Sequence, residues 1–156
     1  DFLWFPTPNF GGYCISRKTY EKCISESNIR ALKRIKDNGA QIVLHTCGLY
    51  DDRFDLVLKE SGDAWHISDT STKKVKEQYG DKVSLMGSIP CVPVLMEGTE
   101  QEVYDFCYKE CMDAAQDGRF ILSGDCDVPP GTSDENMKAA VRAAKDAEKI
   151  LFGKTK

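Results

Sequence analysis

The stretch that decides the fold is residues 42–48, which read Ile-Val-Leu-His-Thr-Cys-Gly. Its three consecutive apolar residues predict a short, buried β-strand. Side chains two positions apart in an extended segment point to the same side, so His45 and Cys47 can present a nitrogen and a sulfur to one point in space. These two groups are half of the ligands that a tetrahedral zinc ion requires.

A second segment follows the same plan later in the chain. Residues 120–126 read Phe-Ile-Leu-Ser-Gly-Asp-Cys, an apolar run that ends in a cysteine before a turn rich in proline and glycine. Catalytic zinc sites use three protein ligands and leave one position open, and His45, Cys47 and Cys126 would be such a set. The simpler alternative is a hydrogen-bonded histidine near a strand end and two cysteines that pack as small apolar residues.

Short apolar strands alternate with amphipathic helices along the sequence. Strands are predicted at residues 2–5, 42–46, 64–68, 83–89 and 120–123, and helices at 17–38, 50–61, 70–79, 99–118 and 133–151. Strict alternation without a hairpin signal predicts a parallel sheet with right-handed crossovers. Neither a GxGxxG nor a P-loop pattern follows any strand, which disfavours a nucleotide-binding sheet.

The number of units and the length of the chain point to part of a barrel. A (β/α)8 barrel has about 250 residues, and five-eighths of it matches the 156 residues present. Both candidate ligand segments also end strands, where barrel active sites lie. We therefore expect an α/β fold in which residues 1–156 form one partial TIM barrel domain, its C-terminal five βα units. A complete five-stranded open sheet is the alternative. Open barrel edges would leave strands unpaired and could support a homo-oligomer.

Composition and charge exclude several classes of protein. Apolar residues make up 41% of the chain, no apolar run approaches the roughly 18 residues of a membrane span, and the first residues do not resemble a signal peptide. A net charge of −4 with interspersed signs gives no footprint for nucleic acid. Seven irregularly spaced cysteines predict free thiols in a reducing, cytoplasmic compartment. The absence of an initiator methionine is expected of a fragment.

Several motifs together resemble one enzyme superfamily. They read Leu-His-Thr-Cys-Gly, Leu-Met-Gly-Ser-Ile, Gly-Thr-Glu-Gln-Glu-Val, Ile-Leu-Ser-Gly-Asp-Cys-Asp-Val-Pro and Ser-Asp-Glu-Asn-Met, at residues 44–48, 85–89, 98–103, 121–129 and 133–137. Their order and spacing resemble the C-terminal part of the uroporphyrinogen decarboxylase superfamily. The His-x-Cys-Gly motif and the late cysteine resemble its cobalamin-dependent methyltransferase branch, of the methylcobamide:coenzyme M methyltransferase type.

The resemblance implies a zinc-dependent methyltransferase. Such an enzyme moves a methyl group between the cobalamin of a separate corrinoid protein and a small molecule, either a methyl donor or a thiol acceptor such as coenzyme M. The zinc ligands of the branch carry over to His45, Cys47 and Cys126. Two other functions stay open: decarboxylation of a tetrapyrrole, and a non-catalytic half-barrel that binds a partner.

Further residues are candidates for the site. Asp69 ends its predicted strand and is a candidate catalytic residue, with a helix cap as the plain alternative. Gly87 and Asn136 lie in two of the motifs and are candidates for substrate binding. Two departures from the superfamily pattern are compatible with a different methyl donor or acceptor: Pro90 where an aspartate is frequent, and the acidic Asp125 beside Cys126.

The remaining cysteines and the second histidine are expected to be structural. Cys91 is interpreted as a loop thiol rather than a further ligand. Cys107 and Cys111 share the apolar stripe of a predicted helix, which favours core packing over metal binding. His66 lies within a predicted strand and is expected to be a hydrogen-bonded histidine.

Overall fold

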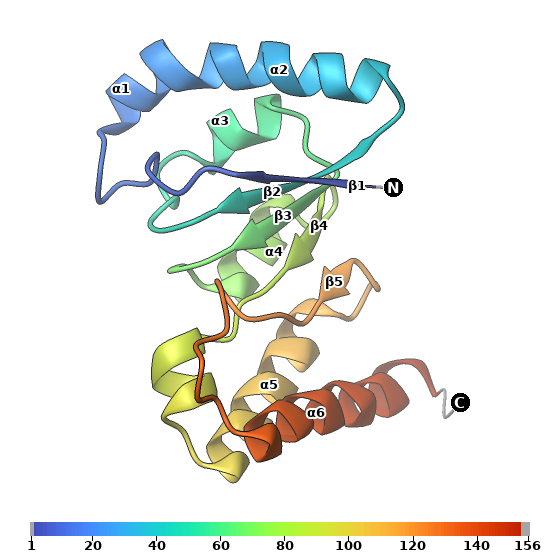
Figure 1. Cartoon of the computed structure of the whole chain (residues 1–156). Helices are drawn as coiled ribbons and strands as arrows, with labels where there is room; N and C mark the ends of the chain where they lie inside the picture. The colour runs from blue at the N-terminus through green and yellow to red at the C-terminus, as the bar shows by residue number, and fades with distance from the viewer. Residues whose placement is uncertain (1, 154–156) are drawn as a thin grey trace.

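Five parallel β-strands alternate with helices in the computed structural model, which describes residues 2–153 (Figure 1). The sheet has the order β1-β2-β3-β4-β5, the same as the order along the chain. The strands are β1 (Phe2–Pro6), β2 (Gln41–Thr46), β3 (Ala64–Ile67), β4 (Ser84–Met86) and β5 (Phe120–Ile121). Sequential, all-parallel order is that of an arc of a (β/α)8 barrel. The predicted α/β fold of five strand–helix units is confirmed.

Helices follow each strand along the chain (Figure 1), and buried residues of α2, α3 and α4 pack with those of the strands in one cluster. They are α1 (Arg17–Tyr20), η1 (Glu21–Ser25), α2 (Glu26–Asp37), α3 (Phe54–Lys59), α4 (Thr72–Tyr79), η2 (Cys91–Met96), α5 (Glu100–Ala114) and α6 (Asp134–Phe152). The first three form the predicted helix 17–38, with a π-helical turn in its middle. A capping box starts α5, because the side chains of Thr99 and Glu102 each bond the other's backbone.

One segment differs from its sequence-based prediction. Residues 91–96 begin with Cys91, which is interpreted from the sequence as a loop thiol, yet they form the π-helical turn η2. Pro90 precedes the turn and Pro93 lies in its first half, where a missing N–H leaves no helical hydrogen bond unmade. Leu95 is 1% exposed, so its burial favours the turn. Tertiary packing thus overrides the local signal for a loop.

The core occupies the side of the sheet that the helices cover. Trp65 on β3 is fully buried, stacks on Phe54 of α3 with ring centroids 5.4 Å apart, and is flanked in the sheet by Leu44 and Leu85. A second cluster joins α5 to α6 and includes Cys107, which confirms its predicted packing role. Side chains alternate along a strand. The residues that precede and follow Leu44, Trp65 and Leu85 in sequence therefore point to the opposite face of the sheet.

Both ends of the sheet carry exposed apolar side chains. At β1, Phe2 is 66% exposed and Leu3 is 38% exposed, and at β5, Ile121 is 54% exposed. Unpaired strand edges of this kind favour association, so a homo-oligomer through these edges stays a prediction. Within residues 2–153, none of the helices has the length and hydropathy that crossing a membrane requires.

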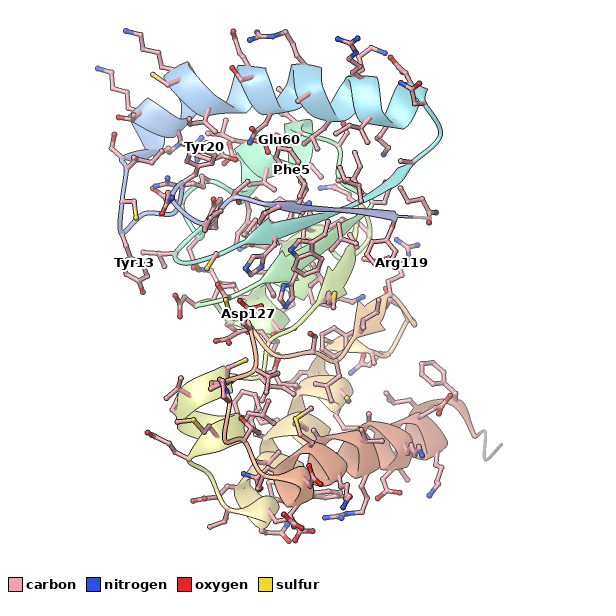
Figure 2. All side chains as sticks on the ribbon, viewed as in Figure 1. Phe5, Tyr13, Tyr20, Glu60, Arg119 and Asp127 are labelled. Carbon is pink, nitrogen blue, oxygen red and sulfur yellow. The ribbon has the colours of Figure 1, made fainter. Side chains whose placement is uncertain are left out.

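A buried polar cluster fastens the first helix to α3. Glu60 is 2% exposed and accepts hydrogen bonds from the Tyr20 hydroxyl (2.6 Å) and from Asn28 Nδ2 (3.1 Å). Figure 2 shows Tyr20 and Glu60 facing each other beneath that helix. Burial raises the pKa of Glu60 to about 7, although both hydrogen bonds favour the charged carboxylate.

The shifted pKa of Glu60 predicts a pH dependence of stability. A carboxyl whose folded-state pKa is raised contributes stability that is fully present below its unfolded pKa of about 4.3 and is lost as the pH rises through about 7. We expect the free energy of unfolding to fall across this window, by on the order of 3 kcal/mol relative to Glu60→Gln.

Urea unfolding at pH 5 and pH 7.5 checks this expectation. Glu77→Gln is the matched control, because Glu77 is exposed on α4. The control should keep the wild-type difference between the two pH values, whereas Glu60→Gln should reduce it. Equal pH profiles for the two variants would contradict the assignment of the effect to Glu60.

Candidate metal centre

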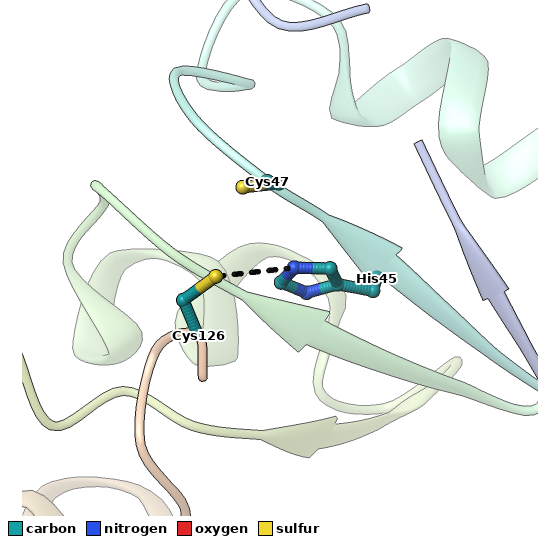
Figure 3. Close-up of side chains that lie close together, drawn as sticks. All are labelled: His45, Cys47 and Cys126. Atoms are coloured by element: carbon teal, nitrogen blue, oxygen red, sulfur yellow. Dashed lines mark hydrogen bonds between the residues drawn. The ribbon is translucent and has the colours of Figure 1, made fainter. Parts of the chain in front are cut away.

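One nitrogen and two sulfurs meet at the C-terminal end of β2 (Figure 3). His45 is the penultimate residue of the strand, Cys47 follows the strand, and Cys126 comes from the loop after β5. Their ligand atoms all lie within 4.8 Å of one another, and His45 Nε2 is 3.9 Å from Cys126 Sγ. A tetrahedral zinc ion separates such ligand atoms by about 3.5–3.8 Å, so small side-chain movements suffice to surround it.

The sheet holds the ring of His45. The residue is paired with Pro6 on β1 and with His66 on β3, on the face opposite the apolar row of Leu44. Its backbone carbonyl accepts hydrogen bonds from the amide and hydroxyl of Thr7, at 2.9 and 2.8 Å. Its ring stacks on Trp4, with centroids 5.3 Å apart. The imidazole is therefore packed against an aromatic ring before any metal binds.

The turn after Cys47 directs that thiol toward His45. Gly48 adopts a φ of +94°, a conformation that residues with a β-carbon rarely adopt. Its amide donates to Ser68 Oγ at 2.8 Å, which ties the turn to the end of β3. The chain leaves the sheet directly after Cys47, so the thiol remains half-exposed at the strand end.

The loop that carries Cys126 is fastened to the end of β4. The Cys91 amide donates to Asp125 Oδ1 at 3.1 Å, and the Asp125 amide donates to the carbonyl of Ile89 at 2.8 Å. The thiol of Cys91 donates to the carbonyl of Cys126 at 3.4 Å. Cys91 therefore supports the loop, as expected of a structural thiol. Asp125, which departs from the superfamily pattern, supports the same loop.

Burial determines the protonation states of His45 and Cys47 when no cation is bound. It lowers the pKa of His45, with His66 adding to the shift, so the imidazole keeps a free lone pair at neutral pH. Burial and the neighbouring Cys126 thiol raise the pKa of Cys47, which therefore stays protonated. A divalent cation favours the thiolate. One imidazole and two thiols also form a donor set that zinc prefers, so these residues fit a zinc ion.

The three side chains line an open cleft of about 380 Å³. Trp4, His66 and Asp127, the last labelled in Figure 2, also line it. The position of His66 in this cleft was not predicted from the sequence. One feature of the sequence could have predicted it: His45 and His66 each lie one residue before the end of a strand. A larger hollow of about 460 Å³ along α6 has no histidine or cysteine in its lining.

Two predicted substrate-binding residues lie outside the cleft lining. Asn136, 5% exposed, donates from Nδ2 to the carbonyls of Leu95 (2.9 Å) and Gly98 (2.8 Å), which joins α6 to η2. Gly87 has a φ of +125°, and a β-carbon there would lie 2.8 Å from the carbonyl oxygen of Ile67. Both positions have structural reasons for their residue type, and a role in substrate binding stays a prediction.

Asp69 also lies outside the cleft lining. It has a φ of +49° and lines a separate polar pocket of about 290 Å³, together with Thr72, Glu110 and Asp125. Its charge is nevertheless close enough to raise the pKa of Cys47. A catalytic role for Asp69 stays a prediction.

The sequence pattern of a protein family extends over most of the chain. The family is described as Uroporphyrinogen decarboxylase (URO-D), and residues 8–147 match it. The chain belongs to this family. The matched range includes four of the five strands and all three candidate ligands, and the resemblance noted in the sequence is confirmed.

This URO-D family chain is similar to one methyltransferase in sequence and to another solved methyltransferase structure in fold. The chain is 29% identical over 147 residues to a methylated-thiol–coenzyme M methyltransferase from Methanosarcina mazei, covering 92% of the chain and 37% of that protein. Its fold is similar to the solved structure of a methyltransferase from Methanosarcina mazei, with a TM-score of 0.79 at 22% identity, covering 94% of the chain and 42% of that structure. The chain therefore spans about two-fifths of the relatives that it matches.

Proposed function

We propose that this chain is part of a zinc-dependent methyltransferase in which His45, Cys47 and Cys126 hold the metal. The observation that carries the proposal is the convergence of their ligand atoms within 4.8 Å, although the third comes from a loop far along the chain. The similarity to a methylated-thiol–coenzyme M methyltransferase supports the reaction class. The other methyl carrier in the proposal is the cobalamin of a separate corrinoid protein.

Zinc at this site would supply the positive charge that favours the thiolate form of a substrate thiol. The thiolate is the nucleophile, and a free thiol with a pKa of about 8.5 is only a few percent ionised at neutral pH. With three protein ligands, one coordination position stays available to substrate. The proposed substrate is therefore a methylated thiol or a thiol acceptor such as coenzyme M.

The residues around the proposed metal position would shape the substrate site. Trp4 and Pro6 give one wall of the cleft an apolar surface, which can contact a methyl group and exclude water. Trp4 and Pro6 belong to β1, and Pro8 of the loop after it also lines the cleft, so β1 and this loop form that wall. The seven free cysteines support the cytoplasmic location that we propose.

Metal analysis and a methyl-transfer assay test this proposal together. We expect about one zinc per chain in the purified protein, and zinc-dependent transfer of a methyl group between methylcobalamin and coenzyme M. A chelator should abolish the transfer, and added zinc should restore it. Decarboxylation of uroporphyrinogen that survives zinc removal would contradict the proposal and favour the decarboxylase alternative.

A further inference from the structure

The side chain of His66 connects two parts of the proposed metal site. It is 3% exposed and lies on β3, between the strand that carries His45 and the loop that carries Cys126. Its Nε2 is 2.6 Å from the carbonyl oxygen of Gly124, two residues before Cys126. Because a carbonyl oxygen only accepts, Nε2 carries the proton and donates this hydrogen bond.

The other contact of His66 is with the ring of His45. The two rings are stacked, with centroids 4.6 Å apart and an interplanar angle of 27°. Trp4 lies against both rings, at 5.3 Å from His45 and 4.9 Å from His66. The plane of the His45 ring is therefore set by its two aromatic neighbours. That plane decides whether Nε2 faces the sulfur of Cys126, which is 3.9 Å away.

Hydrogen bonds connect the Cys126 loop to two different segments of the chain. The bonds of Asp125 to Cys91 and Ile89 fasten the loop to the end of β4. The bond from His66 to Gly124 fastens it to β3, whose neighbour in the sheet is β2 with His45. The contacts with Ile89 and Cys91, which follow β4, hold one side of the loop, and the contact with His66 ties it to the strand beside His45.

We infer that His66 is a positioning residue for the metal: it orients His45 by stacking and holds Cys126 near it through Gly124. The inference rests on the proposed function, since it concerns the same three ligands. The ligand atoms that converge are those of His45, Cys47 and Cys126, whereas His66 Nε2 is engaged with Gly124. Loss of such an outer-shell contact typically lowers metal affinity by about 10- to 100-fold.

Two substitutions separate the hydrogen bond from the ring. His66→Phe keeps an aromatic ring to stack on His45 and removes the donor. His66→Gln removes the ring and keeps an amide donor. We expect His66→Phe to weaken zinc binding about 10- to 100-fold in competition with a chromophoric chelator, and His66→Gln to weaken it less. With Co²⁺ as probe, the visible absorption of His66→Phe should differ from that of the wild type, because Cys126 is displaced.

Tyr20→Phe is the matched control for stability. It removes a buried hydrogen bond to Glu60, away from the cleft. This variant should lower the melting temperature of the metal-free protein and leave zinc affinity and the Co²⁺ spectrum unchanged. A folded His66→Phe protein that binds zinc as tightly as the wild type, with the same Co²⁺ spectrum, would overturn the role of His66 alone. A wild-type protein that binds neither ion would overturn the role of His66 and the proposed function together.

Discussion

Cys126→Ser is expected to lower the zinc affinity of the protein by more than about 100-fold, because it removes a ligand itself and not only an outer-shell contact. The Cys126 sulfur lies 3.9 Å from His45 Nε2, where a serine hydroxyl is both shorter and a poorer zinc ligand. Cys126 is exposed, so the substitution should leave the stability of the metal-free protein almost unchanged. Cys47→Ser should have an equally large effect on zinc.

Competition with a chelator, read together with metal content per chain, measures the change. Cys14→Ser is the matched control, because Cys14 is also an exposed, free cysteine but lies outside the three-residue cluster. The control should bind zinc with wild-type affinity. Retention of one tightly bound zinc per chain in Cys126→Ser would rule out the proposed ligand set.

Trp65→Ala should have the largest effect on stability, a loss of about 3–5 kcal/mol. Trp65 is fully buried and contacts Phe54 and Tyr79, with ring centroids 5.4 and 5.3 Å apart. Removal of the indole leaves a cavity between the sheet and the helices, which the rigid strands on either side cannot close. Urea unfolding gives the change in free energy.

The same substitution at Trp4 provides a control of equal chemistry. Trp4 is 39% exposed on β1, so Trp4→Ala removes a ring that is already partly in water and leaves no enclosed cavity. Its loss of stability should be clearly smaller. An equal loss of stability at the two positions would contradict the expectation that the buried Trp65 contributes more to stability than the partly exposed Trp4.

The order of elements could be predicted because it depends on local patterns. Apolar runs such as residues 42–44 and the cap at Thr99 act over a few neighbouring residues, and the structure has a strand and a helix start there. Strand ends were less predictable. The expected strand 83–89 ends as β4 at Met86, because Gly87 takes a left-handed φ of +125° and the chain turns. A parallel sheet followed from the alternation of elements.

The candidate site was only partly predictable. The proximity of His45 and Cys47 follows from the two-residue repeat of an extended chain, and the sequence alone was sufficient to suggest it. Asp69 and Asn136 were candidates because of their place in the sequence, yet both lie outside the cleft lining. The position of a side chain in the sequence does not reveal which backbone groups it binds. For Asn136, those groups are two carbonyls of the segment before α5.

The sequence by itself determined the succession of strands and helices and the pairing of a nitrogen with a sulfur at the end of one strand, because these depend on periodicities within a few residues. Only the tertiary structure decided that Cys126 meets that pair and that His66 contacts both the His45 ring and the loop of Cys126. Those contacts depend on the register of separate strands and on the path of a loop. Both are set by packing between segments far apart in the chain, which no local pattern of residues records.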